Sequence, residues 1–132
     1  MSSTATTSPE ITAHSARTVV LSKDLFFGMR IRWTMQQLGY SVSLTQDSST
    51  FLAKLSEVGQ TASLGFVDFN QPVSWDELAS AISTGVPIIA FGSHKDVEGF
   101  RAAKAAGVAR VVSNGEFSRS LPALVEKYAT VT

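Results

Sequence analysis

The stretch Leu64-Gly-Phe-Val-Asp68-Phe-Asn-Gln-Pro72 decides how this chain of 132 residues folds. It belongs to an apolar run, residues 62–69, that is typical of a buried strand and contains one carboxylate, Asp68, near its end. A carboxylate in apolar surroundings has to be paired, hydrated at the strand end or shifted in pKa. Asp68 is therefore either the centre of a site or a strand-end residue that caps the next turn.

Short apolar runs alternate with helical patterns along the rest of the chain. The runs predict strands at residues 18–22, 40–45, 62–69, 88–91 and 109–112. A segment of helical spacing follows each strand. Pro122 has no backbone N–H, which a helix tolerates in its first turn, so the last helix is predicted to start near Ser120. Since parallel neighbours need crossovers, we predict an α/β fold: a three-layer, doubly wound, flavodoxin-like domain with a five-stranded parallel sheet of order 2-1-3-4-5 and five helices.

Composition excludes several classes of function. The chain has 11 basic and 11 acidic residues and no cysteine, so disulfide, zinc-thiolate and cysteine-nucleophile chemistry is absent. A net charge of zero is a poor match for the phosphates of DNA or RNA, and no apolar run reaches the roughly 18–20 residues of a membrane span. We therefore expect neither a nucleic acid nor a membrane as partner.

The chain is expected to hold one domain. Residues 1–17 contain eight Ser or Thr and almost no large apolar residue, which predicts a flexible tail before a folded domain at residues 18–130. The tail has neither the apolar centre of a secretory signal nor the arginines of a mitochondrial address. A cytoplasmic location is expected.

The segment Phe66-Val-Asp68-Phe-Asn70-Gln-Pro72 resembles the third-strand signature of response-regulator receiver domains, the CheY-like family. In that family the Asp is the phosphoacceptor and a Pro follows four residues later. The likeness extends over residues 18–129, and it includes the motifs Leu38-Gly-Tyr40, Val86-Pro87 and Ala105-Ala-Gly107. The resemblance implies a receiver fold with Asp68 in the phosphoacceptor position.

The end of the first strand departs from that family. Receivers place two acidic residues there, which hold Mg²⁺ together with the phosphoacceptor, whereas the matching positions are Ser22 and Lys23, with Asp24 one residue later. A hard dication needs oxygen ligands, usually including one or two carboxylates. We predict that the Lys23 ammonium stands in place of the metal and pairs with Asp68; the alternative is a Lys23 that points to solvent.

Other functional positions have changed as well. Receivers have a Ser or Thr at the end of the fourth strand, where this chain has Gly92 with Ser93 beside it. They have a Lys after the fifth strand, where this chain has Ser113, and an aromatic switch residue in that strand, where this chain has Arg110. Phosphoryl transfer depends on charge stabilisation by the metal and that cation, so their loss predicts a disabled pocket. This degenerate pocket comprises Ser22, Lys23, Asp24, Asn70, Gly92, Ser93 and Ser113.

The sequence thus predicts a stand-alone atypical receiver, without enzymatic activity or cofactor, that acts through contact with another signalling protein or a second copy of itself. No room for an output domain is expected after Tyr128. The candidate contacts lie on the first helix and on the face of the fourth helix, fifth strand and fifth helix. They are Phe26, Trp33, Phe100, Arg101, Lys104, Arg110, Glu116 and Arg119.

Two other functions stay open. One is a working receiver that a histidine kinase phosphorylates on Asp68, with Mg²⁺ bound and with Asp24 and Ser93 as displaced helpers. The other is a flavodoxin-like protein that binds FMN or another small molecule, which the fold alone allows. The segment after the first strand, Ser22-Lys-Asp-Leu-Phe-Phe27, is unlike the Thr/Ser-rich phosphate loop that FMN binding requires.

Overall fold

The computed structural model describes residues 16–57 and 60–129. The predicted tail therefore lies outside the described residues, apart from its last two positions. Arg17 belongs to the first strand, with its side chain buried and paired with Glu57 at 3.6 Å, so the folded domain begins at least one residue earlier than predicted.

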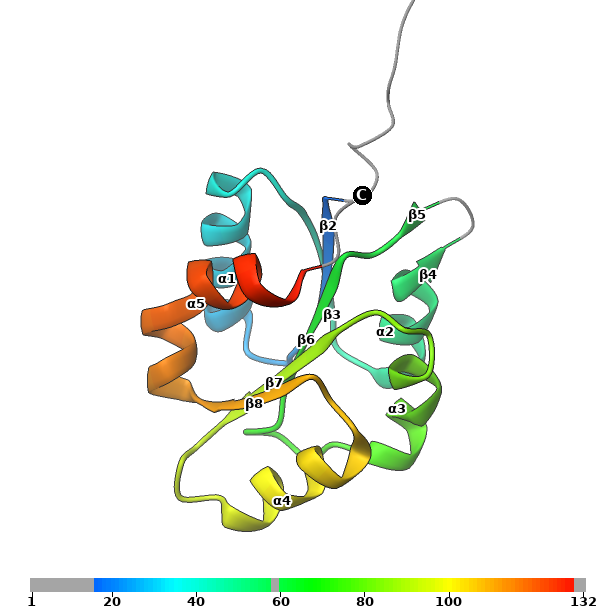
Figure 1. Cartoon of the computed structure of the whole chain (residues 1–132), viewed down its shortest axis with the longest axis vertical. Helices are drawn as coiled ribbons and strands as arrows, with labels where there is room; N and C mark the ends of the chain where they lie inside the picture. Colours follow the sequence, from blue (N-terminus) through cyan, green and yellow to red (C-terminus); the bar gives the residue numbers. More distant parts are fainter. Residues whose placement is uncertain (1–15, 58–59, 130–132) are drawn as a thin grey trace, which may run out of the picture.

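Five parallel strands form the central sheet in the order β3-β2-β6-β7-β8 (Figure 1). Their bounds are β2 Arg17–Leu21, β3 Ser41–Thr45, β6 Leu64–Asp68, β7 Ile88–Gly92 and β8 Arg110–Ser113. Numbered along the chain, these five strands have the predicted order 2-1-3-4-5, which confirms the doubly wound α/β fold. A short antiparallel pair that the sequence pattern did not predict, β4 (Ser56–Glu57) and β5 (Gln60–Thr61), stands apart from this sheet.

Five helices cover the two faces of the sheet. Figure 1 shows α1 and α5 on one side, and α2, α3 and α4 on the other. Their bounds are α1 Leu25–Gln37, α2 Ser48–Leu55, α3 Trp75–Ile82, α4 Val97–Ala106 and α5 Asn114–Tyr128. Among the described residues no helix is long and apolar enough to cross a membrane.

Two separate cores follow from the alternation of side chains along the strands. Val19 and Val67 point into the core beneath α2, α3 and α4, whereas their neighbours Val20 and Phe66 point into the core beneath α1 and α5. Because both faces are buried, the central strands are continuously apolar, which is why residues 62–69 are so conspicuous in the sequence.

Helix α5 begins six residues before the predicted Ser120. Ser113 caps it, because its hydroxyl accepts a hydrogen bond from the backbone N–H of Glu116 at 3.1 Å. Pro122 lies inside the helix on its exposed side, where water can reach the Ser118 carbonyl that loses its N–H partner. Phe117, which is fully buried, fixes the early turns against the sheet.

Candidate functional site

The site lies at the carboxyl ends of the central strands. Asp68 is the last residue of β6, between β2 and β7, and its side chain is only 2% exposed. A cleft of about 550 Å³ opens in front of it, between the start of α1 and the start of α5. Its lining consists of Lys23, Asp24, Phe27, Arg30, Asp68, Asn70, Gln71, Asn114 and Ser118.

Three hydrogen-bond donors occupy the carboxylate of Asp68. The Ser22 hydroxyl donates to Oδ2 at 2.7 Å, and Asn70 donates to Oδ1 twice, from its backbone N–H at 2.8 Å and from Nδ2 at 2.7 Å. The Asp24 backbone N–H donates in turn to the Ser22 oxygen at 3.1 Å, which leaves the hydroxyl proton of Ser22 directed at Asp68. The buried charge is thus stabilised by neutral donors, as buried polar groups require.

Lys23 does not pair with Asp68. The ion pairs between described residues do not include it, and its side chain is exposed, so the predicted ammonium–carboxylate contact is wrong for this structure. Ser22 and Lys23 are neighbours at a strand end, where successive side chains point to opposite sides, and Ser22 takes the inward position. The backbone N–H of Lys23 donates a hydrogen bond to Gln71 Oε1 at 2.6 Å.

A pair of amides lies beside the carboxylate in the lining of the cleft. Asn70 Nδ2 donates to Asn114 Oδ1 at 2.9 Å, and Asn114 Nδ2 donates back to Asn70 Oδ1 at 2.9 Å. Asn114 directly follows β8, so its position in the sequence makes it a candidate for the carboxyl edge of the sheet, although the predicted degenerate pocket does not include it. Its pairing with Asn70 is a contact that the sequence does not show.

An aromatic ring fills the position expected for a hydroxyl. Gly92 ends β7, and a Cβ built on it would lie 2.3 Å from Cε1 of Phe69. The Phe69 ring also lies against Gly99, where an added Cβ would be 2.7 Å from Cδ1 of Phe69. The rings of Phe69 and Phe100 meet edge-on, with their centroids 5.4 Å apart. Sequence reasoning missed Phe69, because nothing in one sequence shows that its ring covers Gly92 and Gly99.

Three other predicted pocket residues accept hydrogen bonds from nearby backbone N–H groups. Asp24 caps α1 by accepting from the Phe27 N–H at 3.0 Å, and Ser113 caps α5. Ser93 accepts from the Lys95 N–H at 3.2 Å in the turn before α4. Each of these side chains therefore has a local backbone partner, and Asp24 also lines the cleft.

These residues do not fit a resident Mg²⁺ ion. No group of three or more His, Cys, Asp or Glu within the described ranges could hold a metal. The oxygens of Asp68 already accept three hydrogen bonds, and Asp24 Oδ1 is bound to the N-terminus of α1. A hard dication would have to displace these donors without a second free carboxylate.

Arg110, the switch-equivalent residue, ties β8 to both ends of α5. It pairs with Glu116 at 2.9 Å near the start of the helix. A hydrogen bond with Tyr128, at the end of the helix, and then the Glu116 charge raise the pKa of Arg110 above its ordinary value. Arg110 is thus part of a fixed contact that replaces the aromatic side chain expected at this position.

The candidate partner residues differ in how accessible they are. Phe26 and Trp33 on α1 are 87% and 65% exposed, whereas Phe100 is half-buried against Phe69. Arg101 pairs with Glu98 at 3.1 Å on the exposed side of α4. The remaining candidates are Lys104 and Arg119, which are exposed, and Glu116, which is half-buried.

No protein-family model matches the sequence, and no curated protein matches it. Solved structures do match. Vibrio cholerae chemotaxis protein CheY4 has a TM-score of 0.70 and 18% identity over 86% of this chain and 98% of that one. A CheY-like receiver protein from Methanospirillum hungatei has a TM-score of 0.72 and 17% identity over 86% and 92% of the two chains.

A response-regulator receiver protein from Burkholderia phymatum has a TM-score of 0.67 and 23% identity over 85% of this chain and 96% of that one. These likenesses each cover 85–86% of this chain. The chain therefore has the fold of CheY-like response-regulator receiver domains, with Asp68 at the carboxyl edge of its sheet.

Proposed function

We propose that this chain is a signalling and protein-interaction module built on the receiver fold, and that it works without Mg²⁺-dependent phosphorylation of Asp68. One observation carries this proposal: both oxygens of the Asp68 carboxylate are held by hydrogen bonds from Ser22 and Asn70. A phosphoacceptor carboxylate attacks the incoming phosphorus with an oxygen lone pair. In this chain the hydrogen bonds to both oxygens of Asp68 draw on that electron density and restrict the direction of attack.

The surroundings of Asp68 support the same conclusion. Phosphoryl transfer is promoted by positioning and by cations that neutralise the developing charge, since the protein does little covalent chemistry itself. The carboxylates that would bind a metal are replaced by Ser22, which points inward, and Lys23, which points outward. The hydroxyl that would hold a phosphoryl oxygen is replaced by the Phe69 ring over Gly92.

Beryllofluoride, which imitates an aspartyl phosphate, tests the proposal directly. We expect that adding beryllofluoride with millimolar Mg²⁺ leaves the amide NMR shifts of Asp68, Asn70 and Asn114 unchanged. A specific, saturable shift of these amides would contradict the proposal and favour a working receiver.

A rebuilt pocket gives the matched positive control. In the variant Ser22→Asp, a new carboxylate takes the inward position beside Asp68, and Asp24 already lines the same cleft, which brings together the acidic groups that a metal site needs. We expect Mg²⁺ alone to move the Asp68 and Asn70 amides in this variant and to leave the wild type unmoved. The variant Lys95→Asp, an exposed charge change in the turn before α4, should respond like the wild type.

A further inference from the structure

Helix α1 is apolar on two opposite sides. One side is buried against the sheet through Gly28, Ile31 and Met35. The other side carries large apolar residues that are exposed to solvent. These residues are Leu25, Phe26, Met29 and Trp33.

The exposed residues of α1 form one stripe with basic edges. At about 100° per residue, Leu25, Met29, Trp33 and Phe26 fall within an arc of roughly 100°. Arg30 and Arg32 fall just outside its two edges, and α1 has no acidic residue. Aromatic residues, Met and Arg are the residue types enriched in protein interfaces, so this composition is typical of a docking surface. We call Leu25, Phe26, Met29, Arg30 and Trp33 the α1 surface.

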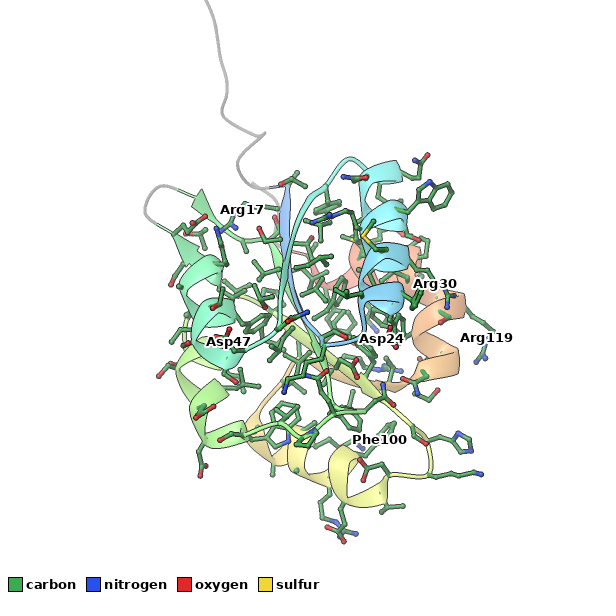
Figure 2. All side chains as sticks on the ribbon, turned by 180° about the vertical axis from the view of Figure 1, so that it is seen from behind. Arg17, Asp24, Arg30, Asp47, Phe100 and Arg119 are labelled. Carbon is green, nitrogen blue, oxygen red and sulfur yellow. The ribbon has the colours of Figure 1, made fainter. Side chains whose placement is uncertain are left out.

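The basic character extends onto α5. Figure 2 shows the side chains of Arg30 and Arg119 on the same side of the molecule. Neither takes part in an ion pair with another described residue, whereas Arg110 is neutralised by Glu116. A partner of the α1 surface therefore has to bring negative charge together with an apolar contact.

The side of the fold that carries α2 and α3 has both negative charge and an apolar contact. A hollow of about 430 Å³ lies at the starts of α2 and α3, with Leu52 as its apolar residue and Asp47 and Glu77 as its charges. Asp76, also exposed, stands in the first turn of α3 beside Glu77. Hydrogen bonds from Thr50 and Ser49 lower the pKa of Asp47, which keeps its carboxylate ionised. We call Asp47, Ser48, Ser49, Leu52 and Glu77 the α2–α3 hollow.

The two surfaces thus carry opposite charge and lie on opposite sides of the fold. Figure 2 shows Asp47 on one side of the sheet, and Arg30 and Arg119 on the other. Packing of two antiparallel α1 surfaces against each other about a two-fold axis would bring like charges together, because Arg30 lies at one edge of the stripe, about halfway along it, and would approach its own copy. Charge complementarity favours contact between unlike surfaces instead.

We propose that the α1 surface of one chain docks in the α2–α3 hollow of a second copy. The inference rests on the proposed function as an interaction module and names a partner for it. Because the contact joins two different surfaces on opposite sides of the sheet, it is heterologous. An assembly then keeps a free α1 surface at one end and a free α2–α3 hollow at the other. Chains would therefore add head to tail.

Sedimentation of the wild type at low salt is the first test. We expect the average mass to rise with protein concentration and to pass that of a dimer without a plateau. Added salt should reduce the association, because exposed charges are screened beyond about 8 Å at physiological ionic strength. A chain that stays monomeric, or that stops at a dimer, overturns the proposal.

A mixing experiment tests the pairing of the two surfaces. Trp33→Glu damages the α1 surface and Glu77→Lys damages the α2–α3 hollow, so each variant alone should be monomeric. Each variant keeps the surface that the other lacks. An equimolar mixture should therefore form one-to-one dimers and nothing larger, and a mixture that stays monomeric overturns the proposal.

Two controls complete the test. Lys104→Glu alters an exposed charge on α4, outside both surfaces, and should associate like the wild type; loss of association in this variant would place the contact elsewhere. Thermal unfolding of Trp33→Glu and Lys104→Glu should match the wild type, because these side chains are exposed. Glu77→Lys should unfold at a slightly lower temperature but remain folded, because it places a cation in the first turn of α3. Sedimentation of a monomeric wild type with anionic vesicles would assign the α1 surface to a lipid and overturn the proposal. None of these measurements involves Asp68, so they can fail while the beryllofluoride result stands.

Discussion

Asn70 and Asn114 exchange two hydrogen bonds, each 2.9 Å long, between the loop after β6 and the first turn of α5. Asn70 uses its backbone N–H and its Nδ2 to hold Asp68 as well. The amide pair therefore connects the buried carboxylate to the start of a helix that lies 44 residues further along the chain. Loss of the amide pair would therefore disturb both the surroundings of Asp68 and the start of α5.

The amide pair should be energetically coupled. Asn70→Ala and Asn114→Ala each remove both hydrogen bonds of the pair, so the double variant should lose less stability than the sum of the two single variants. We expect a coupling energy of about 0.5–3 kcal/mol from a double-mutant cycle in urea unfolding. Ser118→Ala, an exposed change on the same cleft wall, should alter stability by less than about 0.5 kcal/mol. Additive effects of the two Asn variants would argue against the coupling.

Ser22→Ala should destabilise the fold by about 1–3 kcal/mol, because it leaves Oδ2 of a buried carboxylate without its donor. The matched control is Ser49→Ala, which also removes a hydroxyl donor to an aspartate, in this case the exposed Asp47. Urea unfolding of both variants measures the difference. Equal losses for Ser22 and Ser49 would mean that Asp68 does not depend on this hydrogen bond.

Gly92→Ala should destabilise the fold by about 1–3 kcal/mol, because its new Cβ would lie 2.3 Å from Cε1 of Phe69 and the ring cannot yield without disturbing Phe100. Gly28→Ala provides the contrast. Gly28 lies inside α1, where Ala is preferred to Gly by about 1 kcal/mol, and its Cβ would meet Leu44 at an ordinary 3.4 Å.

Combining Gly92→Ala with Phe69→Leu should restore part of the lost stability, because the smaller side chain removes the ring atoms that the new Cβ meets. Thermal unfolding of the single and double variants measures the effect. A Gly92→Ala protein as stable as the Gly28→Ala protein would show that Phe69 does not fill this position.

Much of the fold follows from the sequence because the information is local or periodic. Alternating apolar runs and helical spacing predict the strand order, and they place Asp68 at the carboxyl edge of the sheet. The predicted start of α5 is wrong because the pattern places Pro122 in a first turn, whereas its exposed position lets the helix continue through it. Solvent exposure at that position is a tertiary property, which local pattern does not contain.

The site was less predictable than the fold because it depends on which side chains converge. Ser22 and Lys23 are adjacent, and only the direction in which the chain leaves β2 decides that the Ser22 hydroxyl reaches Asp68. The contact of Asn70 with Asn114 joins two loops that are distant in sequence. The Phe69 ring over Gly92 depends on the absence of a Cβ, which the sequence shows, and on a rotamer, which it does not.

Asp47 links stability to pH. Its pKa is lowered chiefly by the hydrogen bond from the Thr50 backbone N–H, which caps α2, with further contributions from the hydroxyls of Thr50 and Ser49. A carboxyl whose pKa is lowered by folding contributes stability above its unfolded pKa and loses that contribution as the pH falls through its folded value. Asp47→Asn retains a good N-cap residue but cannot ionise.

We therefore expect the stability difference between wild type and Asp47→Asn to be constant near neutral pH and to change only as the pH falls below about 4, the ordinary range of an aspartate. Urea unfolding at a series of pH values measures this difference. Thr50→Val removes the hydroxyl donor but keeps the backbone N–H, so it should retain most of the same pH dependence, since the backbone hydrogen bond is the larger cause. A wild type and an Asp47→Asn variant with parallel profiles down to acid pH would show that the cap does not lower this pKa.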